Sequence, residues 1–451
     1  MVKEFDLIVI GAGSGLNLIP ENIKTALVEK GPMGGTCLNR GCIPSKIIIH
    51  SADVAELLKR ADDFGIKASI KGIDFAKITK RSSKIVDTDA GEIEKSIRSS
   101  KHITLFKGIG KFIAERTLKV GKNIIKGKKI IIAAGARPTI PPIKGLDKVK
   151  YMTSTEALRI TKQPKILTII GGGYIAAELA HFYGALGTKI NIVQRNVRLV
   201  PREDGEISEK FTDIFKKKYN VYLEHAVNKV EKKGKNYYVE IERKNGGGRK
   251  VLVSDSLLIA TGVTPNSDTL DLSKTNVKVN KYGYIISNDY LETTAKNVWV
   301  LGDIAGKYLF KHSANLEAQY ASLNALQNKR SKVDYKAMPH AIFSSPQIAG
   351  VGYTENELKE KGIKYAIGKY NYIDTGMGIA LQDNQGFVKI MADPKTRKIL
   401  GCHILGNEAS TLIHEVILAM RNDLTVDDIM NTVHIHPALS EVIQRAAFRI
   451  K

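Results

Sequence analysis

The sequence has few cysteines and no long apolar segment. Only three of its 451 residues are cysteine, which is too few for a disulfide-stabilised secreted fold. A chain of this length does not need disulfides to be stable. No apolar run reaches the roughly 18–20 residues that a helix needs to cross a bilayer. Glu4 and Asp6 interrupt the first apolar stretch, so the start of the chain does not read as a signal peptide. We therefore expect a cytoplasmic protein with no membrane association.

Acidic residues are fewer than basic ones. The 69 lysines and arginines exceed the 46 acidic residues and give a net charge of +23. Such a charge attracts phosphate groups and nucleic acid. The lysines are spread along the chain, however, and no recognised nucleic-acid-binding module is present. We expect no nucleic-acid partner, and a basic nucleic-acid-binding protein is the last-ranked of three functional hypotheses.

A dinucleotide-binding pattern begins the chain. The apolar run 5–10 is typical of a buried parallel strand, and the glycines after it allow a tight turn close to a pyrophosphate. A second strand, 24–28, ends at a carboxylate that could accept hydrogen bonds from ribose hydroxyls. Leu16 replaces a fingerprint glycine, and Pro20 should shorten or kink the intervening helix. The expected cofactor-binding residues are Gly11, Gly13, Ser14, Gly15, Glu29 and Lys30.

A second pattern of this kind follows an apolar run at 166–170. Three glycines come next, and Ala176 takes the third small position of the fingerprint. A helix should extend to about residue 186, and the next strand, 189–193, ends in a glutamine instead of the acid that favours NAD. Two nearby arginines suit a 2′-phosphate, so NADPH is the preferred donor and NADH the alternative. The expected nucleotide-binding residues are Gly171, Gly173, Tyr174, Ile175, Glu178, Gln194, Arg195 and Arg198.

Three further strand ends carry candidate cofactor residues. Residues 129–134 and 256–260 should each form a strand that ends in a glycine-containing turn and returns the chain to another lobe. A third strand, 298–301, places a carboxylate at a sheet edge, where it could accept from a flavin polyol hydroxyl or cap the next helix. The candidates are Ala134, Gly135, Arg137, Gly262, Gly302 and Asp303.

The most informative segment reads Gly-Gly-Thr-Cys-Leu-Asn-Arg-Gly-Cys-Ile-Pro-Ser-Lys. Cys37 and Cys42 would be about 7.5 Å apart along a regular helix, whereas a disulfide needs Cα atoms roughly 4.4–6.8 Å apart. Gly41 and a nearby proline allow the necessary break. A bridge across so small a loop adds little stability and suits repeated opening. Zinc would need further soft ligands, and Cys402 is expected in a core strand, so no metal site is predicted.

The C-terminal region offers a base for such a thiol. His436 lies within the segment His-Ile-His-Pro, and Glu441 follows it five positions later. Only a thiolate attacks a disulfide, so a reactive cysteine needs a group that takes its proton. His436 could do so, with Glu441 orienting the imidazole and stabilising its cation.

Together these motifs resemble the flavin-dependent pyridine nucleotide–disulfide oxidoreductases over essentially the whole chain. That family includes dihydrolipoamide dehydrogenase, mycothione reductase and glutathione reductase. The resemblance implies an α/β fold with two Rossmann-like three-layer domains, for FAD and NAD(P), and a C-terminal α+β dimerisation domain. The expected segments are 1–148 and 263–334 for FAD, 149–262 for NAD(P) and 335–451 for dimerisation.

The resemblance also implies roles for single residues. Hydride passes from the nicotinamide to the flavin, and the flavin then reduces the disulfide. Cys42 would be the flavin-side sulfur and Cys37 the sulfur that exchanges with substrate. Lys46 would lie near the flavin ring, paired with Glu178, and Tyr174 would be a movable ring over the nicotinamide pocket. The family's histidine reaches the other subunit's dithiol, so the active unit is a homodimer. Gly35 and Thr36 are further expected cofactor residues.

The substrate stays open between two alternatives. The dithiol segment and the pair His434/His436 resemble dihydrolipoamide dehydrogenase, which implies a lipoyl substrate and a 2-oxoacid dehydrogenase complex as a candidate partner. Segments 311–315 and 435–439 resemble mycothione reductase and, with the arginines, favour NADPH-driven reduction of a small disulfide. The second of the three functional hypotheses is a flavoprotein NAD(P)H oxidase or electron carrier. The cysteine pair argues against it, since an oxidase needs one redox cysteine or none.

Overall fold

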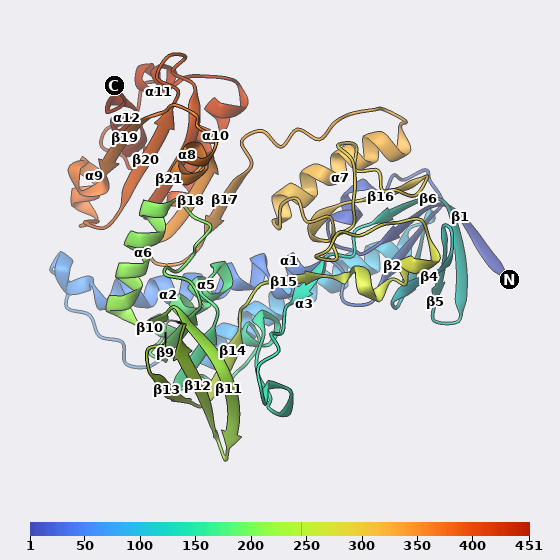
Figure 1. Ribbon diagram of the computed structural model, residues 1–451, viewed down its shortest axis with the longest axis horizontal. Coiled ribbons are helices and arrows are strands. Elements are labelled where there is room, and N and C mark those ends of the chain that lie inside the picture. The colour runs from blue at the N-terminus through green and yellow to red at the C-terminus, as the bar shows by residue number, and fades with distance from the viewer. Residues whose placement is uncertain (245) are drawn as a thin grey trace.

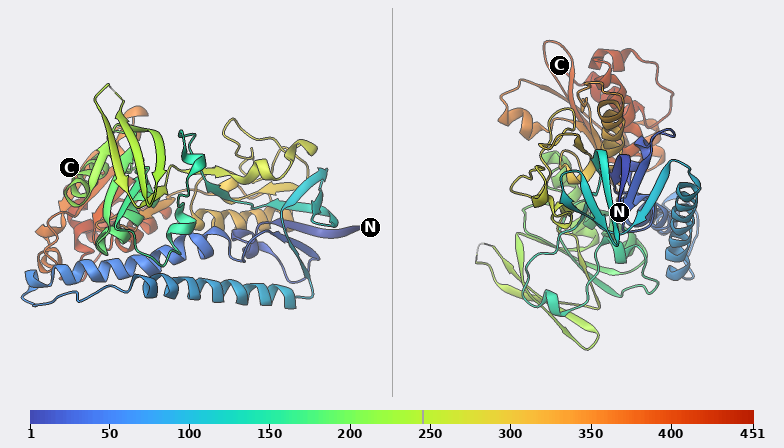
Figure 2. Two further views of the ribbon diagram at one scale, coloured as in Figure 1. Left: turned by 90° about the horizontal axis from the view of Figure 1, so that it is seen from below. Right: turned by 90° about the vertical axis from the view of Figure 1, so that its right-hand side faces the viewer.

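The computed structural model describes residues 1–244 and 246–451 and has three lobes (Figure 1). One lobe surrounds a seven-stranded sheet, a second a four-stranded parallel sheet, and the third a five-stranded sheet. Helices α2 (Cys42–Lys59) and α3 (Phe75–Ser99) run side by side along one side of the molecule (Figure 2). This is the expected mixed α/β architecture, and α2 connects the first lobe to the second.

The first lobe has the expected three layers. Its strand order is β3-β2-β1-β6-β5-β4, with β16 also paired to β6. Along β1, Leu7 and Val9 face the core under α7 (Lys311–Leu326), whereas Ile8 and Ile10 face the core under β4 and β5. The strands are β1 (Val2–Ile10), β2 (Thr25–Glu29), β3 (Ile103–Lys107), β4 (Gly110–Ala114), β5 (Thr117–Val120), β6 (Asn123–Ile132) and β16 (Val298–Val300).

The helix expected after the first glycine turn is reduced to the short 3₁₀ helix η1 (Ser14–Leu18). Pro20 follows at once, and its ring cannot continue a helix. Helix α7 packs against η1, and the Asn315 side chain accepts hydrogen bonds from Ser14 and Asn17 at 2.9 Å each. The predicted shortening is confirmed, and α7 covers the face that a longer helix would occupy.

The second lobe repeats the parallel pattern with the strand order β10-β9-β8-β14. Helices α5 (Tyr174–Ala185) and α6 (Gly205–Lys218) contribute to its core, and a three-stranded antiparallel sheet packs beside it. Strands β7 (Ala136–Pro138) and β15 (Val263–Pro265) pair where the chain enters and leaves this lobe. The other strands are β8 (Ile166–Ile170), β9 (Lys189–Gln194), β10 (Asn220–Leu223), β11 (His225–Lys233), β12 (Asn236–Arg243), β13 (Arg249–Ser254) and β14 (Ser256–Ile259).

The third lobe is an antiparallel sheet in the order β17-β18-β21-β20-β19 with helices packed on it. Cys402 lies in β21 (Ile399–Gly406) and is fully buried, as the expected core cysteine. The remaining strands are β17 (Pro339–Ile342), β18 (Gln347–Gly352), β19 (Ala366–Asn371) and β20 (Phe387–Ala392). The helices are α8 (Glu355–Glu360), α9 (Gly376–Ala380), α10 (Ala409–Arg421), α11 (Val426–Asn431) and α12 (Glu441–Phe448).

The sequence pattern favours helices at 51–60 and 87–101, and in the structure the two long helices at these places begin earlier, at Cys42 and Phe75. Helix α2 starts at Cys42, because its buried residues Ile48 and Ile49 already face the core of the second lobe. Helix α3 starts at Phe75, where the Asp74 carboxylate accepts a hydrogen bond from the Lys77 amide and caps the helix. Within residues 1–244 and 246–451, no helix is long and apolar enough to cross a membrane.

Candidate functional site

The two glycine turns are built alike. Gly11 has φ +107°, and a Cβ there would lie 2.2 Å from the Ala133 carbonyl oxygen. Gly171 has φ +116°, and a Cβ would lie 2.2 Å from the Ala260 carbonyl oxygen. In each lobe only glycine lets the first strand turn so tightly against its neighbouring strand. No atom lies within 4 Å of a Cβ built on Gly173, so the start of α5 is open to an approaching group.

Glu29 closes the first turn. Its Oε2 accepts a hydrogen bond from the Ala12 amide at 2.8 Å, and its Oε1 accepts from the Gly31 amide at 2.6 Å. The carboxylate therefore lies at the carboxyl end of β2, beside the glycines, where the sequence placed it. A carboxylate acceptor in this place fits the ribose hydroxyls of a dinucleotide, and the glycine turn beside it fits the pyrophosphate.

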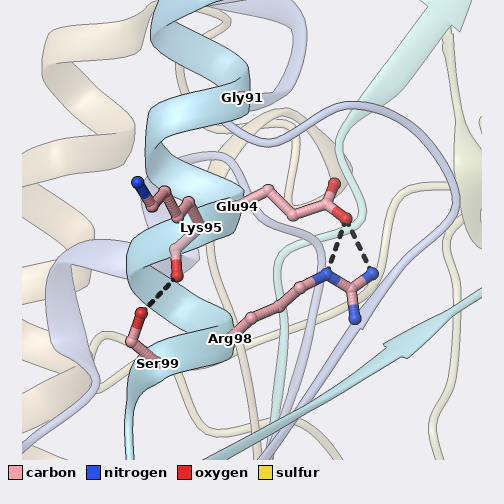
Figure 3. Close-up of a pocket in the computed structure, with 5 residues that line it drawn as sticks. All are labelled: Gly91, Glu94, Lys95, Arg98 and Ser99. Atoms are coloured by element: carbon pink, nitrogen blue, oxygen red, sulfur yellow. Dashed lines mark hydrogen bonds and ion pairs between the residues drawn. The ribbon is translucent and has the colours of Figure 1, made fainter.

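A surface hollow beyond Glu29 is lined by Lys30, Gly31, Pro32, Lys107 and part of α3. A neighbouring hollow, drawn in Figure 3, is formed by α3 alone. There the Glu94 carboxylate accepts from Arg98 at 2.7 Å, and Ser99 donates to the Lys95 carbonyl oxygen. Because these groups satisfy one another along one helix, the second hollow has no converging side chains for a ligand.

The cysteines lie on two helices that meet at Gly41. Cys37 belongs to α1 (Gly35–Arg40), and Cys42 is the first residue of α2. A Cβ on Gly41 would lie 2.9 Å from the Thr36 carbonyl oxygen, so the break that brings the cysteines together requires glycine. The start of α1 lies against the first glycine turn, since a Cβ on Gly35 would lie 2.7 Å from the Gly13 Cα.

The two sulfurs are free thiols with different acidities. A hydrogen bond from the Cys42 thiol lowers the pKa of Cys37 to about 7, and the nearby cations Lys311 and Lys46 act in the same direction. The interaction with Cys37, together with burial, raises the pKa of Cys42. Cys37 is therefore the sulfur that carries negative charge near neutral pH, as an exchanging nucleophile must.

Lys46, four residues after Cys42, forms an ion pair with Glu178 of α5. The ammonium lies 2.8 Å and 2.9 Å from the two carboxylate oxygens and 4.2 Å from the Phe343 ring centre. The Phe343 amide donates to the same carboxylate at 3.1 Å. Residues from α2, α5 and the segment after β17 thus fix one positive charge close to the dithiol.

The nucleotide-binding candidates lie at the carboxyl end of β9 and the start of α5. Gln194 is buried, and its side-chain oxygen accepts from the Arg195 amide at 2.8 Å. Arg198 donates to the Gly205 carbonyl oxygen at 2.9 Å, which fixes its guanidinium against α6. Arg195 is exposed and takes part in none of the ion pairs found in the described part of the chain. Of the two arginines, Arg195 is the one whose guanidinium forms no hydrogen bond or ion pair with residues 1–244 and 246–451.

The remaining candidates lie either just after β16 or in the crossover between the first two lobes. Burial raises the pKa of Asp303, whose carboxyl group lies just after β16, where a flavin polyol was expected. Arg137 is instead committed to an ion pair with Asp268, at 2.6 Å and 2.8 Å. Ala134 and Gly135 lie in the same crossover, where Asn266 donates to the Ala134 carbonyl oxygen. Arg137 therefore stabilises the crossover between the first two lobes.

His436 and Glu441 form a pair in the third lobe. The imidazole Nδ1 lies 3.0 Å from a Glu441 oxygen, and the other oxygen accepts from the Ala438 amide at 3.1 Å. This hydrogen bond to His436 lowers the pKa of Glu441. The His436 side chain is 74% exposed, and no hydrogen bond or ion pair among residues 1–244 and 246–451 joins it to the cysteine segment. The chain thus carries the dithiol and its expected base on separate surfaces.

Lys311, Glu203 and His340 were not among the site residues expected from the sequence. Lys311 begins α7, acts on Cys37 and donates to the Ser14 hydroxyl at 3.0 Å. Glu203 and His340 contact Tyr174 from two other elements. A lysine at a helix start and a histidine in a strand carry no distinctive spacing, so only the fold reveals their positions.

Comparison with known proteins identifies the family. Residues 5–325 match the family described as pyridine nucleotide-disulphide oxidoreductase, and residues 338–447 match the dimerisation domain of the same family. The chain is 35% identical to dihydrolipoyl dehydrogenase 1, mitochondrial, of Arabidopsis thaliana, over 98% of this chain and 90% of the relative. It is 33% identical to the mycothione reductase of Mycobacterium tuberculosis, over the full length of both.

Solved structures agree with this assignment. A Cu(II) complex of the HOCl-induced flavoprotein disulfide reductase RclA from Escherichia coli has a TM-score of 0.89 and 26% identity, with each chain fully covered. The expected fold class, the cofactors FAD and NAD(P)H, the action on sulfur groups and the homodimer are therefore confirmed at the level of the family. The chain belongs to the pyridine nucleotide–disulphide oxidoreductases and is an FAD-dependent disulfide oxidoreductase.

Proposed function

We propose that the protein moves two electrons between NAD(P)H and a dithiol/disulfide substrate through Cys37 and Cys42, in the manner of a dihydrolipoamide dehydrogenase. The observation that carries this proposal is the unequal thiol pair across Gly41, in which Cys37 has a pKa of about 7. A thiol of that acidity is partly ionised at neutral pH and still a good nucleophile. The lipoyl substrate is supported by the similarity to dihydrolipoyl dehydrogenases.

The chain's own groups account for thiol exchange. In the reducing direction, the Cys37 thiolate attacks one sulfur of the substrate disulfide, and the departing thiolate takes a proton from His436 of the second subunit. Cys42 then gives its proton to the same His436 and attacks Cys37, the second substrate thiolate leaves and takes that proton, and a disulfide joins Cys37 and Cys42. Lys46 and Glu178 hold a fixed positive charge beside this segment. Bound FAD supplies the two-electron transfer that links the nicotinamide to this disulfide.

We also propose which residues hold the cofactors and how the chain divides. The first glycine turn, Glu29 and Asp303 hold FAD, and the second glycine turn with Gln194 and Arg195 holds the nicotinamide nucleotide. The division into 1–148, 149–262, 263–334 and 335–451 follows the lobes around the three sheets. A cytoplasmic location and, for a lipoyl substrate, docking to a 2-oxoacid dehydrogenase complex complete this proposal.

A second candidate is NADPH-driven reduction of a small disulfide. The exposed Arg195 favours it, because a guanidinium without an intramolecular partner can bind a 2′-phosphate without breaking an existing contact. The similarity to mycothione reductase points the same way.

Steady-state turnover separates these functions. Purified holoenzyme is assayed with NADH and NADPH against lipoamide, glutathione disulfide, bis-γ-glutamylcystine and coenzyme A disulfide, and with NAD⁺ and dihydrolipoamide in the reverse direction. We expect the lipoyl pair to give the highest kcat/KM. A small disulfide preferred with NADPH would support the second candidate. Rapid NAD(P)H oxidation by oxygen, with no turnover of any disulfide, would contradict both and indicate an oxidase.

Lys311 provides a test of the thiol electrostatics. Lys311→Met removes a positive charge that favours the Cys37 thiolate, so the pKa of Cys37 should rise. The pH dependence of iodoacetamide alkylation in the reduced protein measures this shift, and the rate at pH 7 should fall. Lys307→Met, which removes a charge four residues earlier that acts on Glu317, is the control. An unchanged alkylation profile in Lys311→Met would contradict the assignment.

A further inference from the structure

Tyr174 lies in a group of three nearly parallel rings. It is the first residue of α5, and its ring centre is 6.2 Å from that of Phe310 and 6.1 Å from that of His340. Phe310 and His340 are 6.3 Å apart, and the three interplanar angles are 14–20°. Phe310 precedes α7 and His340 lies in β17, so the rings come from all three lobes.

Glu203 binds two of these rings at once. Its side chain is 0% exposed; one oxygen accepts a hydrogen bond from the Tyr174 hydroxyl, and the other lies 2.8 Å from His340 Nε2. Burial alone would raise the pKa of Glu203, but His340 and the Tyr174 hydroxyl outweigh it and hold the pKa below its ordinary value. A buried carboxylate needs such partners, because an unpaired one is strongly disfavoured.

The turn that carries Glu203 cannot follow Tyr174 if the ring moves. The next residue, Asp204, caps α6, accepts from the Glu355 amide at 3.0 Å and pairs with the buried Lys389 at 2.9 Å. Lys389 lies in β20, so the turn is fixed between the second and third lobes. A displaced Tyr174 would therefore leave Glu203 behind with His340 as its remaining side-chain partner.

We propose that Glu203 and His340 are positioning residues that hold the Tyr174 ring over the nicotinamide pocket and set the free energy needed to displace it when NAD(P)H binds. This inference rests on the proposed role of Tyr174 as the ring that covers this pocket. Nucleotide entry must break the hydrogen bond to a buried carboxylate and the ring contacts. The same contacts return the ring to its place, and exclude water, once the nucleotide leaves.

Three variants of the holoenzyme test whether Glu203 and His340 hold the Tyr174 ring in place. Glu203→Gln keeps the shape but removes the charge, Tyr174→Phe keeps the ring but removes the hydroxyl, and His340→Phe keeps a ring but removes the nitrogen. Each should tighten binding of the nucleotide that supports turnover, measured by calorimetry with NADP⁺ or NAD⁺, by about three- to tenfold. The KM for the reduced nucleotide should fall with kcat changed much less. The double variant Glu203→Gln/Tyr174→Phe should match Tyr174→Phe alone, because without the hydroxyl the charge of Glu203 has no hydrogen bond to Tyr174 left to strengthen.

Another histidine–carboxylate pair, whose histidine lies in α5, supplies the matched control. His181 lies 2.7 Å from Asp53 of α2, and Asp53→Asn removes the charge from this pair without changing any of the three rings. This variant should leave nucleotide affinity unchanged. Suppose that Tyr174→Ala tightens nucleotide binding, whereas Glu203→Gln and His340→Phe leave the affinity unchanged or weaken it. The proposed role of Glu203 and His340 is then wrong, and the covering role of Tyr174 stands. If Tyr174→Ala also has no effect, the covering role itself is wrong.

Discussion

Cys37→Ser should lower disulfide turnover by at least about a thousandfold, because the serine hydroxyl cannot supply the nucleophile that the exchange requires. Cys42→Ser should be equally inactive, since no second thiol would remain to release the product from Cys37. Both variants should keep NAD(P)H oxidation by ferricyanide, an acceptor that needs no thiol. The measurement is the ratio of the two activities in each purified holoenzyme.

The third cysteine supplies the control for this experiment. Cys402 lies buried in β21, and burial raises the pKa of its thiol, so it cannot serve as a thiolate near neutral pH. Cys402→Ala should therefore keep both activities per folded molecule, whatever its effect on stability. Disulfide turnover that survives in Cys37→Ser would contradict the proposal, and unchanged NAD(P)H oxidation with a physiological acceptor would then favour an electron carrier.

Local patterns in the sequence were sufficient to predict a structural feature where its backbone geometry admits only one kind of residue. The turns at Gly11 and Gly171 each need a positive φ and the absence of a side chain, so glycine after an apolar strand is a reliable sign of them. Gly41 is similar, because its close approach to the Thr36 carbonyl leaves no room for a Cβ. Pro20 also acts locally, because its ring ends the first helix.

Contacts between distant segments could not be read in this way. Glu203 and His340 are 137 residues apart, and nothing in their neighbours indicates that both contact Tyr174. Arg137 follows a strand, but nothing near it in the sequence indicates its ion pair with Asp268, which β7 and β15 bring close. Long-range pairing depends on how the lobes pack, and local patterns in a single sequence do not show which distant segments meet.

His436→Gln should lower disulfide turnover by about a hundredfold or more, because a positioned acid–base group typically contributes that much. Glu441→Gln should have a smaller effect, since the imidazole would remain but lose the carboxylate that orients it at 3.0 Å. The steady-state rate with the preferred disulfide measures both. Ferricyanide reduction should be unchanged in each variant, because that reaction needs no proton transfer to sulfur.

Hybrid dimers test whether His436 acts on the other subunit. In a dimer of one Cys37→Ser and one His436→Gln subunit, action across the interface leaves one site with both groups intact and one with neither. Random mixing makes half of the dimers hybrids, so an equal mixture should recover about one quarter of the wild-type activity. Action within one subunit would leave every site defective, and no activity would return. The 74% exposure of His436, and its separation from the dithiol in one chain, lead us to expect recovery.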